Sequence, residues 1–159
     1  MVTALSDLLD EAQAVIVCGG LGPTPDDVTR EAIAEVMGVP LVRREELVEK
    51  IAAMFGMRDR DMPANNLRQA DIPEGARVIP NALGTAPGVM AEIAGKVIYA
   101  VPGVPYEMQA MIKDFVIPDL LERAGMRSVI VSRSLKTWGT SESGLAEMIA
   151  TQVDAQSNP

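Results

Sequence analysis

The stretch that decides the fold runs from Val15 to Thr29 and reads VIVCGGLGPTPDDVT. It starts as an apolar segment, passes through three glycines within four residues, and ends in two adjacent aspartates, Asp26 and Asp27. The apolar run Ala14–Cys18 is typical of a strand buried on both faces of a parallel sheet. A glycine-rich turn after such a strand offers backbone N–H groups to a phosphate. Two carboxylates at the end of a phosphate-binding turn are unexpected and need an explanation.

Composition limits the classes of function that are open to this chain. Its 159 residues, 48% of them hydrophobic, suit one domain with a substantial core. The net charge of −8 argues against a nucleic-acid or membrane partner held by charge. The single cysteine, Cys18, cannot form an internal disulfide and is expected to be an inert core thiol, which suits a cytoplasmic protein. Because histidine is absent, carboxylates, hydroxyls, amines or the backbone must carry any acid–base or metal chemistry.

Helical and strand patterns alternate along the chain, which predicts a three-layer α/β/α sandwich with a mostly parallel sheet. Gly95 turns two of the predicted strands into a hairpin, and Pro118 is expected to kink or restart the helix that begins near Pro105. The predicted helices are Thr3–Glu11, Asp26–Met37, Arg44–Phe55, a short helix after Pro63, Pro105–Arg123 and Ser141–Ala150. The predicted strands are Ala14–Cys18, Ala76–Ile79, Gly88–Ile93, Lys96–Val101 and Ser128–Ser134.

The first glycine turn has a structural and a functional interpretation. In the structural one, Thr24 caps the next helix, Pro25 takes its first position and Asp27 completes a capping box. The functional interpretation explains a feature that a helix cap does not require. The three glycines let a ligand approach the backbone closely. Two carboxylates repel a bare phosphate but accept one that carries a divalent cation, since Mg²⁺ is commonly held by one or two carboxylates and phosphate oxygens. The paired aspartates therefore indicate a metal-bridged phosphate or pyrophosphate.

Two further loops carry the same kind of signal. The loop PNALGTAPG, residues 80–88, is either a tight connection between strands or a flexible backbone that presents Asn81 and Thr85 to a ligand. The segment VPGVPYEM, residues 101–108, repeats the order strand, glycine turn, proline and helix, with Glu107 as an early acid. Turns that follow parallel strands meet at one edge of the sheet, where open α/β folds bind ligands.

The segments GGLGPTPDDVT, NNLRQA, PNALGTAPG and VPGVPYEM resemble the N-terminal domain of the CinA family, competence/damage-inducible protein A. That domain belongs to the molybdopterin-binding superfamily with MoaB, MogA and part of MoeA. The four segments come in the family's order and spacing and cover most of the chain. The resemblance implies the MogA/MoaB-like sandwich with a ligand pocket at the loop edge.

The resemblance also implies an activity, metal-dependent hydrolysis of ADP-ribose or a similar dinucleotide pyrophosphate, with Mg²⁺, Mn²⁺ or Co²⁺ as the cation. Together with the loop chemistry, it makes Asp27 and Asp26 the expected catalytic and metal-binding residues. The residues expected to bind the substrate are Gly19, Gly20, Gly22, Thr24, Asn81, Gly84, Thr85, Gly88, Pro102, Gly103, Pro105 and Glu107.

The chain departs from the family pattern at both ends. The family's first strand and its GTELL-x-G loop are absent, so residues 1–125 are expected to form an incomplete molybdopterin-binding-like domain. Residues 126–159 resemble the start of the small α/β subdomain that follows in the family, and the deamidase domain beyond it is missing. The expected open edge at Ala14–Cys18 favours pairing with another chain, and we expect a homo-oligomer.

Two alternative functions stay open. The first is molybdopterin binding or adenylyl transfer, as in MogA-like relatives, where the glycine loop and its aspartate act with Mg²⁺. The second is a truncated domain that binds a nucleotide or a partner protein without turnover, which the missing first loop favours. In either case the expected ligand is a small nucleotide or a pterin.

Overall fold

The structure is a computed structural model, and it describes residues 1–57, 61–125, 134 and 136–155. The chain divides into two units, Met1–Met126 and Arg127–Pro159. In the second unit, α6 (Glu142–Asp154) begins after Ser141, whose hydroxyl accepts a hydrogen bond of 3.2 Å from the N–H of Gly144. The predicted strand Ser128–Ser134 lies outside the described residues except at its last position, and the small α/β subdomain remains a prediction.

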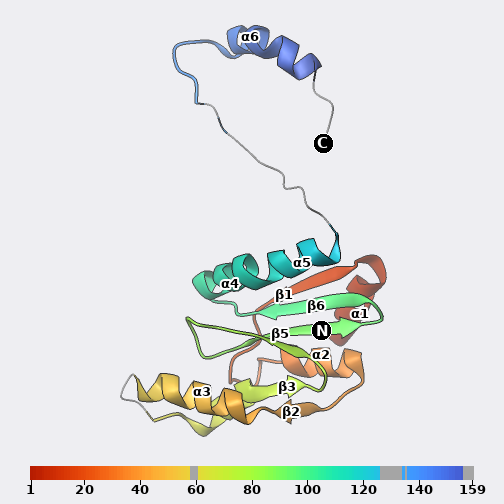
Figure 1. Cartoon of the computed structure of the whole chain (residues 1–159), viewed down its shortest axis with the longest axis vertical. Helices are drawn as coiled ribbons and strands as arrows, with labels where there is room; N and C mark the ends of the chain where they lie inside the picture. The colour runs from red at the N-terminus through yellow and green to blue at the C-terminus, as the bar shows by residue number, and fades with distance from the viewer. Residues whose placement is uncertain (58–60, 126–133, 135, 156–159) are drawn as a thin grey trace. The chain divides into compact units, whose positions relative to one another are not determined.

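The first unit is built on a mixed four-stranded sheet (Figure 1). Its strands, in spatial order, are β1 (Ala14–Cys18), β6 (Lys96–Val101), β5 (Gly88–Ile93) and β4 (Arg77–Ile79). β1 runs parallel to β6, whereas β5 runs antiparallel to both of its neighbours, β6 and β4. A separate antiparallel pair, which the sequence patterns did not predict, joins β2 (Leu41–Arg43) to β3 (Asp71–Pro73).

The α/β sandwich is confirmed, but the expectation of a mostly parallel sheet is corrected to a mixed one. The reason lies in the turn between β5 and β6, where Ala94 and Gly95 both adopt positive φ, 51° and 81°. Two such residues form the tight turn that reverses a strand directly, so the two flanking strands must pair antiparallel. The hairpin itself was predicted correctly, with both strands at their expected bounds.

Helices cover both faces of the sheet (Figure 1). Alternate residues of β6 supply the two sides: Ile98 and Ala100 pack in one hydrophobic cluster, and Tyr99 and Val101 pack in the other. The first cluster includes residues of α1 (Val2–Glu11), α2 (Thr29–Met37) and α3 (Glu45–Gly56). The second includes residues of α4 (Pro105–Met111), the π-helical turn η2 (Ile112–Val116) and α5 (Ile117–Arg123).

Pro118 is accommodated without a break in this last helical segment. The π-turn η2 lies immediately before it, and α5 continues with Pro118 in its first turn. Proline lacks an N–H and its ring crowds the carbonyl of the preceding turn, so a locally widened helix relieves both effects. The predicted irregularity at Pro118 is thus present as a π-turn.

β1 is an edge strand of the described sheet, as the expected open edge at Ala14–Cys18 predicted, but the expectation that it is buried on both faces is corrected. Val15 is buried, but Ile16 is 47% exposed and Cys18 is exposed too. The register aligns Ile16 with Tyr99 and Cys18 with Val101, so both side chains lie on the α4–α5 side of the sheet. In the described part of the chain β6 is the strand that pairs with β1. Cys18 is therefore not an inert core thiol.

A polar cluster fastens α5 to the sheet. The hydroxyl of Tyr99 donates a hydrogen bond of 2.5 Å to Asp119, and Arg123 contacts both Asp119 and Glu92 of β5. Burial, followed by the hydrogen bond to Asp119, raises the pKa of Tyr99 to about 12. The network ties two strands to one helix through charged hydrogen bonds.

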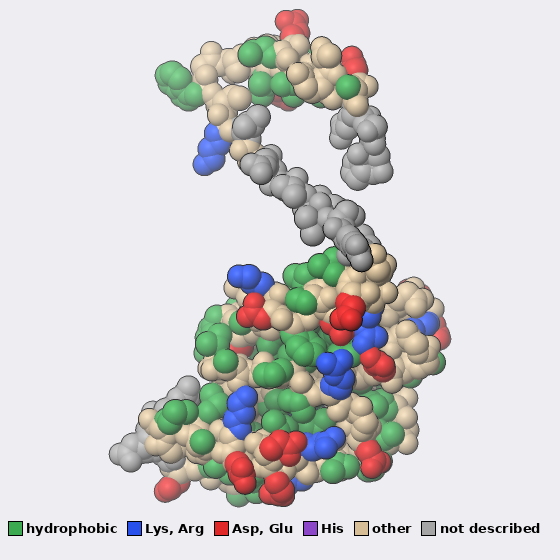
Figure 2. Space-filling view, viewed as in Figure 1, with side chains coloured by type: hydrophobic (Ala, Val, Ile, Leu, Met, Phe, Trp, Pro, Cys, Tyr) green, Lys and Arg blue, Asp and Glu red, His purple; other side chains and the backbone are tan. Residues whose placement is uncertain are grey.

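The surface in Figure 2 carries interspersed acidic and basic side chains on the face of the first unit that it shows. Among the helices of the described residues, none combines the length and the apolar character that a bilayer crossing requires.

Candidate functional site

The first glycine loop is bound tightly to the start of α2. Gly19 and Gly20 have φ values of 95° and 70°, which favour glycine. Thr29 donates two hydrogen bonds to this loop. Its hydroxyl donates to the carbonyl of Gly19 over 2.9 Å, and its backbone N–H donates to the carbonyl of Gly20 over 3.1 Å. A methyl group at Gly20 would lie 2.2 Å from that hydroxyl oxygen. The loop therefore folds back closely on the helix and requires glycine at this position.

The helix begins three residues later than predicted, at Thr29 rather than Asp26. Thr24 and Asp27 do pair, since both the N–H and the hydroxyl of Thr24 donate to Oδ2 of Asp27, over 2.9 and 2.5 Å. The pair closes a turn ahead of the helix instead of capping it, so the capping-box interpretation is corrected. Asp26 is exposed on this turn.

Asp27 is held in its ionised form. Burial by itself would raise the pKa of its carboxyl group, but the hydrogen bonds from Thr24 and from the backbone N–H of Gly22, with the charge of Arg30, lower the pKa below its usual value. Both bonds from Thr24 end on Oδ2. Thr24 thus occupies only one of the two carboxylate oxygens of Asp27.

Arg30, which the sequence interpretation did not single out, supports the same loop from behind. Its side chain is fully buried, at 0% exposure, and donates to the carbonyls of Leu21 and Gly22. In a trans peptide the C=O and N–H point in opposite directions, so the N–H of Gly22 points away from Arg30. Arg30 makes no ion pair with the described residues, and its positive charge lies directly behind the loop.

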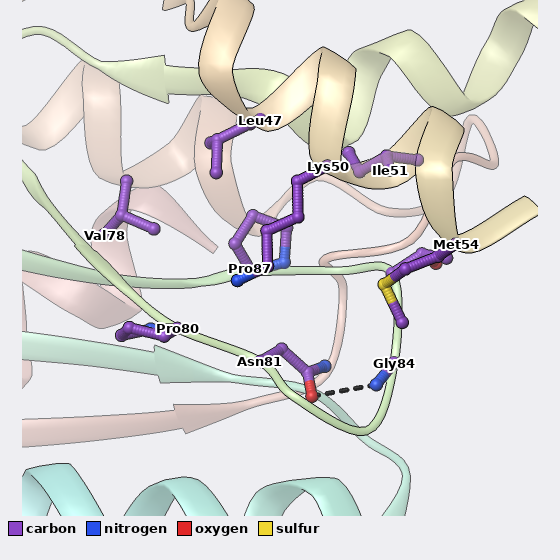
Figure 3. A pocket seen from close by; sticks show the side chains of 10 residues that line it. Leu47, Lys50, Ile51, Met54, Val78, Pro80, Asn81, Gly84 and Pro87 are labelled. Atoms are coloured by element: carbon purple, nitrogen blue, oxygen red, sulfur yellow. Dashed lines mark hydrogen bonds between the residues drawn. The ribbon is translucent and has the colours of Figure 1, made fainter. Parts of the chain in front are cut away.

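The second loop is organised by Asn81, which is 4% exposed. Its Oδ1 accepts hydrogen bonds from the N–H groups of Leu83 and Gly84, and Figure 3 shows the bond to Gly84, 2.9 Å long. Its Nδ2 donates to the carbonyl of Ala86 over 2.9 Å and to Oε2 of Glu107 over 2.7 Å. One amide thus holds the whole loop and joins it to the start of α4.

Glu107 lies in the first turn of α4 and is 7% exposed. Its carboxylate lies so close to Gly84 that a methyl group there would come within 2.2 Å of Oε2. The third loop also touches the first, because a methyl group at Gly103 would lie 3.5 Å from the Cα of Gly19. The three loops predicted to converge at one edge do converge there.

Between these loops lies an open cleft of about 340 Å³. It lies where β1 and β6 end, at the carboxyl edge of the parallel pair. The residues that line it are Gly19, Gly20, Leu21, Gly22, Asp27, Gln69, Thr85, Ala86, Pro102, Gly103, Val104 and Glu107.

Eight of the predicted site residues line this cleft, drawn from all three loops: Gly19, Gly20, Gly22, Asp27, Thr85, Pro102, Gly103 and Glu107. Six others lie outside its lining: Asp26, Thr24, Asn81, Gly84, Gly88 and Pro105. Thr24, Asn81 and Gly84 support lining residues through the contacts above. Gly88 belongs to β5, where a methyl group would lie 2.8 Å from the carbonyl oxygen of Ala100, so it serves sheet packing. Pro105 takes the first helical position of α4.

A second, smaller recess borders the cleft at Thr85 (Figure 3). Apolar side chains from α3, among them Leu47, Ile51 and Met54, face Val78, Pro80 and Pro87 across it. Lys50 extends from α3 toward the loop in the same view.

Gln69 is the second lining or supporting residue that the sequence interpretation did not single out. It lies in the 3₁₀ helix η1 (Ala64–Ala70), where Asn66, Gln69 and Ala70 are buried. The signal available in the sequence was the spacing of two amide residues, Asn66 and Gln69, which lie three positions apart and so share one side of a helical turn. Arg30 had a similar one, a charge in the apolar stripe that contains Ile33 and Ala34.

The donor set fits one hydrated cation better than a closed metal site. Among the described residues, no three acidic or cysteine side chains are grouped to hold a metal. Mg²⁺ nevertheless often takes only one or two carboxylates, with waters and phosphate oxygens completing its shell. Asp27 offers one ionised carboxylate, and no Lys or Arg lines the cleft in the described part of the chain.

Comparison with known proteins now places the chain. Residues 1–122 match the family described as "Probable molybdopterin binding domain". A crystal structure of CinA from Thermoplasma acidophilum is similar with a TM-score of 0.67 and 36% identity, over 74% of this chain and 68% of that one. The chain belongs to the CinA family and corresponds to its molybdopterin-binding-type domain. The resemblance carried by the four sequence segments is thereby confirmed.

Longer CinA relatives match as well. A CinA-like protein of Frankia casuarinae is 49% identical over 97% of this chain and 37% of its own length. One of Gloeobacter violaceus is 46% identical over 92% of this chain and 34% of its own length. The chain thus spans about a third of these CinA-like proteins.

Proposed function

We propose that this CinA-type domain binds a nucleotide pyrophosphate in the loop cleft and hydrolyses it with a divalent cation, ADP-ribose being the expected substrate. The observation that carries the proposal is the arrangement of Asp27, the glycine loop and Glu107 around one cleft of about 340 Å³. Family membership supports a small ligand at this edge, and the loop chemistry supports phosphate.

The cleft offers two attractions to a pyrophosphate. Gly19, Gly20 and Gly22 let the ligand approach the backbone closely, and the buried charge of Arg30 lies behind them. Since no basic side chain of the described residues lines the cleft, the remaining negative charge of the ligand calls for a cation. Asp27 would hold it through its carboxylate, with Asp26 on the same turn as an additional carboxylate.

A bound divalent cation would neutralise the phosphate oxygens and acidify a nearby water. In the reaction, the oxygen of a water adds to one phosphorus and the bridging P–O bond breaks. The leaving phosphate takes the electron pair, and AMP and ribose 5-phosphate are formed. Glu107 is the buried carboxylate best placed to accept the proton of that water and pass it to solvent.

A second candidate function is molybdopterin binding with adenylyl transfer, favoured by the match to a molybdopterin-binding family over residues 1–122. Incubation with molybdopterin and ATP would separate the two, because adenylylated pterin is expected only from the second function. Binding without turnover is the third outcome, recognised by an ADP-ribose isotherm with no product. The homo-oligomer stays a prediction that the mass in solution would test.

The direct test of the proposed function is release of AMP from ADP-ribose by the purified chain with Mg²⁺, Mn²⁺ or Co²⁺. We expect release with a cation and none with a chelator. Cation-independent release, or no release from a chain that circular dichroism shows to be folded, would contradict the proposal.

A further inference from the structure

Gln69 lines the cleft but has no role in the hydrolysis proposed for it. Its side chain is 3% exposed, and it lines the cleft together with Asp27 and the glycine loop. Its Oε1 has no hydrogen-bond partner in the described part of the chain. Buried polar atoms are nearly always paired, so an unpaired acceptor beside a ligand cleft needs a reason.

The neighbouring side chains decide which amide atom is free. Asn66 donates from Nδ2 to the carbonyl of Pro63 and to Oδ1 of Asn65, each over 3.3 Å. Asn66 therefore turns its own Oδ1 toward Gln69, which meets it with Nε2 over a long 3.4 Å. That contact leaves Oε1 of Gln69 as the unpaired atom and holds the amide only weakly.

The segment that carries Gln69 is fixed to the glycine loop. Arg68 donates from one guanidinium nitrogen to the carbonyl of Thr24 over 2.9 Å and from the other to Glu31 over 2.8 Å. Thr24 in turn holds Asp27. Gln69 and Asp27 are thus positioned by one connected network, as expected of residues that act on the same ligand.

The chemistry of the lining indicates what Gln69 would recognise. The other polar side chains of the cleft are the carboxylates of Asp27 and Glu107 and the hydroxyl of Thr85. These are mainly acceptors, and acceptors select ligands rich in O–H or N–H donors. A ribose supplies adjacent hydroxyl groups, whereas a phosphate supplies none at neutral pH.

We propose that Gln69 is a specificity-determining residue that accepts a hydrogen bond from a ribose hydroxyl of the ligand through Oε1. The oxygen is shielded in the free protein, and rotation about the soft terminal torsion of the side chain presents it to the ligand. The identity of the ligand rests on the proposed function, while the role of Gln69 concerns binding alone.

Binding of a non-hydrolysable, methylene-bridged analogue of ADP-ribose in the presence of Mg²⁺, measured by calorimetry, tests this without requiring turnover. Gln69→Leu is expected to weaken binding about tenfold. Removal of one ribose hydroxyl from the ligand should weaken its binding to the wild type by the same factor. Gln69→Leu should bind this deoxy analogue as well as it binds the parent ligand. Gln109→Leu, an exposed glutamine on α4 outside the cleft lining, is the matched control and should bind normally.

The inosine analogue of ADP-ribose separates a sugar hydroxyl from a base amine. If it alone reproduces the loss and the deoxy analogues do not, the donor is the amine and the proposal is overturned. Equal affinity of Gln69→Leu and the wild type would overturn it too. Binding lost in Gln69→Leu, with no hydrolysis by the wild type under any cation, would contradict the proposed function and leave this inference standing.

A second measurement uses the chain without ligand. Because Oε1 is unpaired and Nε2 makes only one long contact of 3.4 Å, to Asn66, replacing Gln69 by leucine should change the urea midpoint little. A clear drop in that midpoint would assign Gln69 to the framework instead of the ligand and would overturn the proposal.

Discussion

The amide of Asn81 donates a hydrogen bond of 2.7 Å to the buried carboxylate of Glu107, across 26 positions of the sequence. That single bond joins the second loop to the third at the cleft. It explains why Asn81 matters to a cleft that it does not line. The same amide also accepts from two backbone N–H groups of its own loop.

Asn81→Asp should therefore destabilise the fold and disorganise the cleft. The variant keeps both acceptor bonds of Oδ1 but replaces the donor to Glu107 with a second buried carboxylate. We expect a loss of about 2 kcal/mol or more in the free energy of unfolding at pH 7, measured by urea denaturation. Asn65→Asp, at an exposed position of η1, is the control. Equal stability of the two variants would contradict the role of this bond.

Gly84 should tolerate no side chain, because the carboxylate of Glu107 occupies the space where a Cβ atom would go. Gly84→Ala is expected to cost about 1–3 kcal/mol of stability and to reduce binding in the cleft. Gly56→Ala is the matched control, since nothing lies within 4 Å of its Cβ position and alanine suits a helix end. If both variants unfolded at the same urea concentration, the close packing of Gly84 on Glu107 would be wrong.

The hydroxyl of Thr24 lowers the pKa of Asp27, so its removal should have a measurable consequence. In Thr24→Val the pKa of the Asp27 carboxyl group is expected to rise, because the bond from the hydroxyl is lost while the backbone N–H bond remains. A carboxyl titration followed by NMR measures this directly. The acid limb of cation-dependent hydrolysis should move to higher pH in parallel. An unchanged titration would show that the hydroxyl does not hold this carboxylate.

Asp119 should make the fold sensitive to acid. Burial alone would raise the pKa of its carboxyl group, but the hydrogen bonds from Tyr99 and Arg123 lower it below the usual 3.8. Because the pKa of Asp119 is lower in the folded chain than in the unfolded chain, its ionised carboxylate stabilises the fold. This stabilisation is complete at pH values above the pKa of the unfolded chain, and it is lost as the pH falls through the pKa of the folded chain. Asp119→Asn should lower stability at pH 7 by about 2 kcal/mol and flatten its dependence on pH below 4. Parallel curves for variant and wild type would contradict this.

Sequence patterns predicted the elements that carry strong local signals. The strands of the Gly95 hairpin, the helix that starts at Pro105 and the convergence of three loops all depend on glycine, proline and apolar spacing. β2 and β3 were missed because three-residue strands show no measurable alternation. The open edge at Ala14–Cys18 was expected only from the family resemblance, because an apolar run by itself does not reveal whether a neighbouring strand is present.

The site was predictable where the backbone conformation requires a particular residue type, as at Gly20, whose positive φ favours glycine. It was not predictable where a side chain acts through tertiary contacts. Arg30 reaches the carbonyls of Leu21 and Gly22 because α2 packs under the loop, and Gln69 enters the cleft through η1. Asp26 and Asp27 look equivalent in sequence, yet the turn closed by Thr24 brings only Asp27 into the lining.

The central claim is that Asp27 holds a catalytic cation in the loop cleft, and the most direct measurement is ADP-ribose hydrolysis by the wild type beside Asp27→Asn. We predict cation-dependent release of AMP that falls at least about a hundredfold in Asp27→Asn, falls less in Asp26→Asn, and is unchanged in Asp10→Asn on the exposed surface of α1. If Asp27→Asn released AMP as fast as the wild type at the same cation concentration, the account of this site would be wrong.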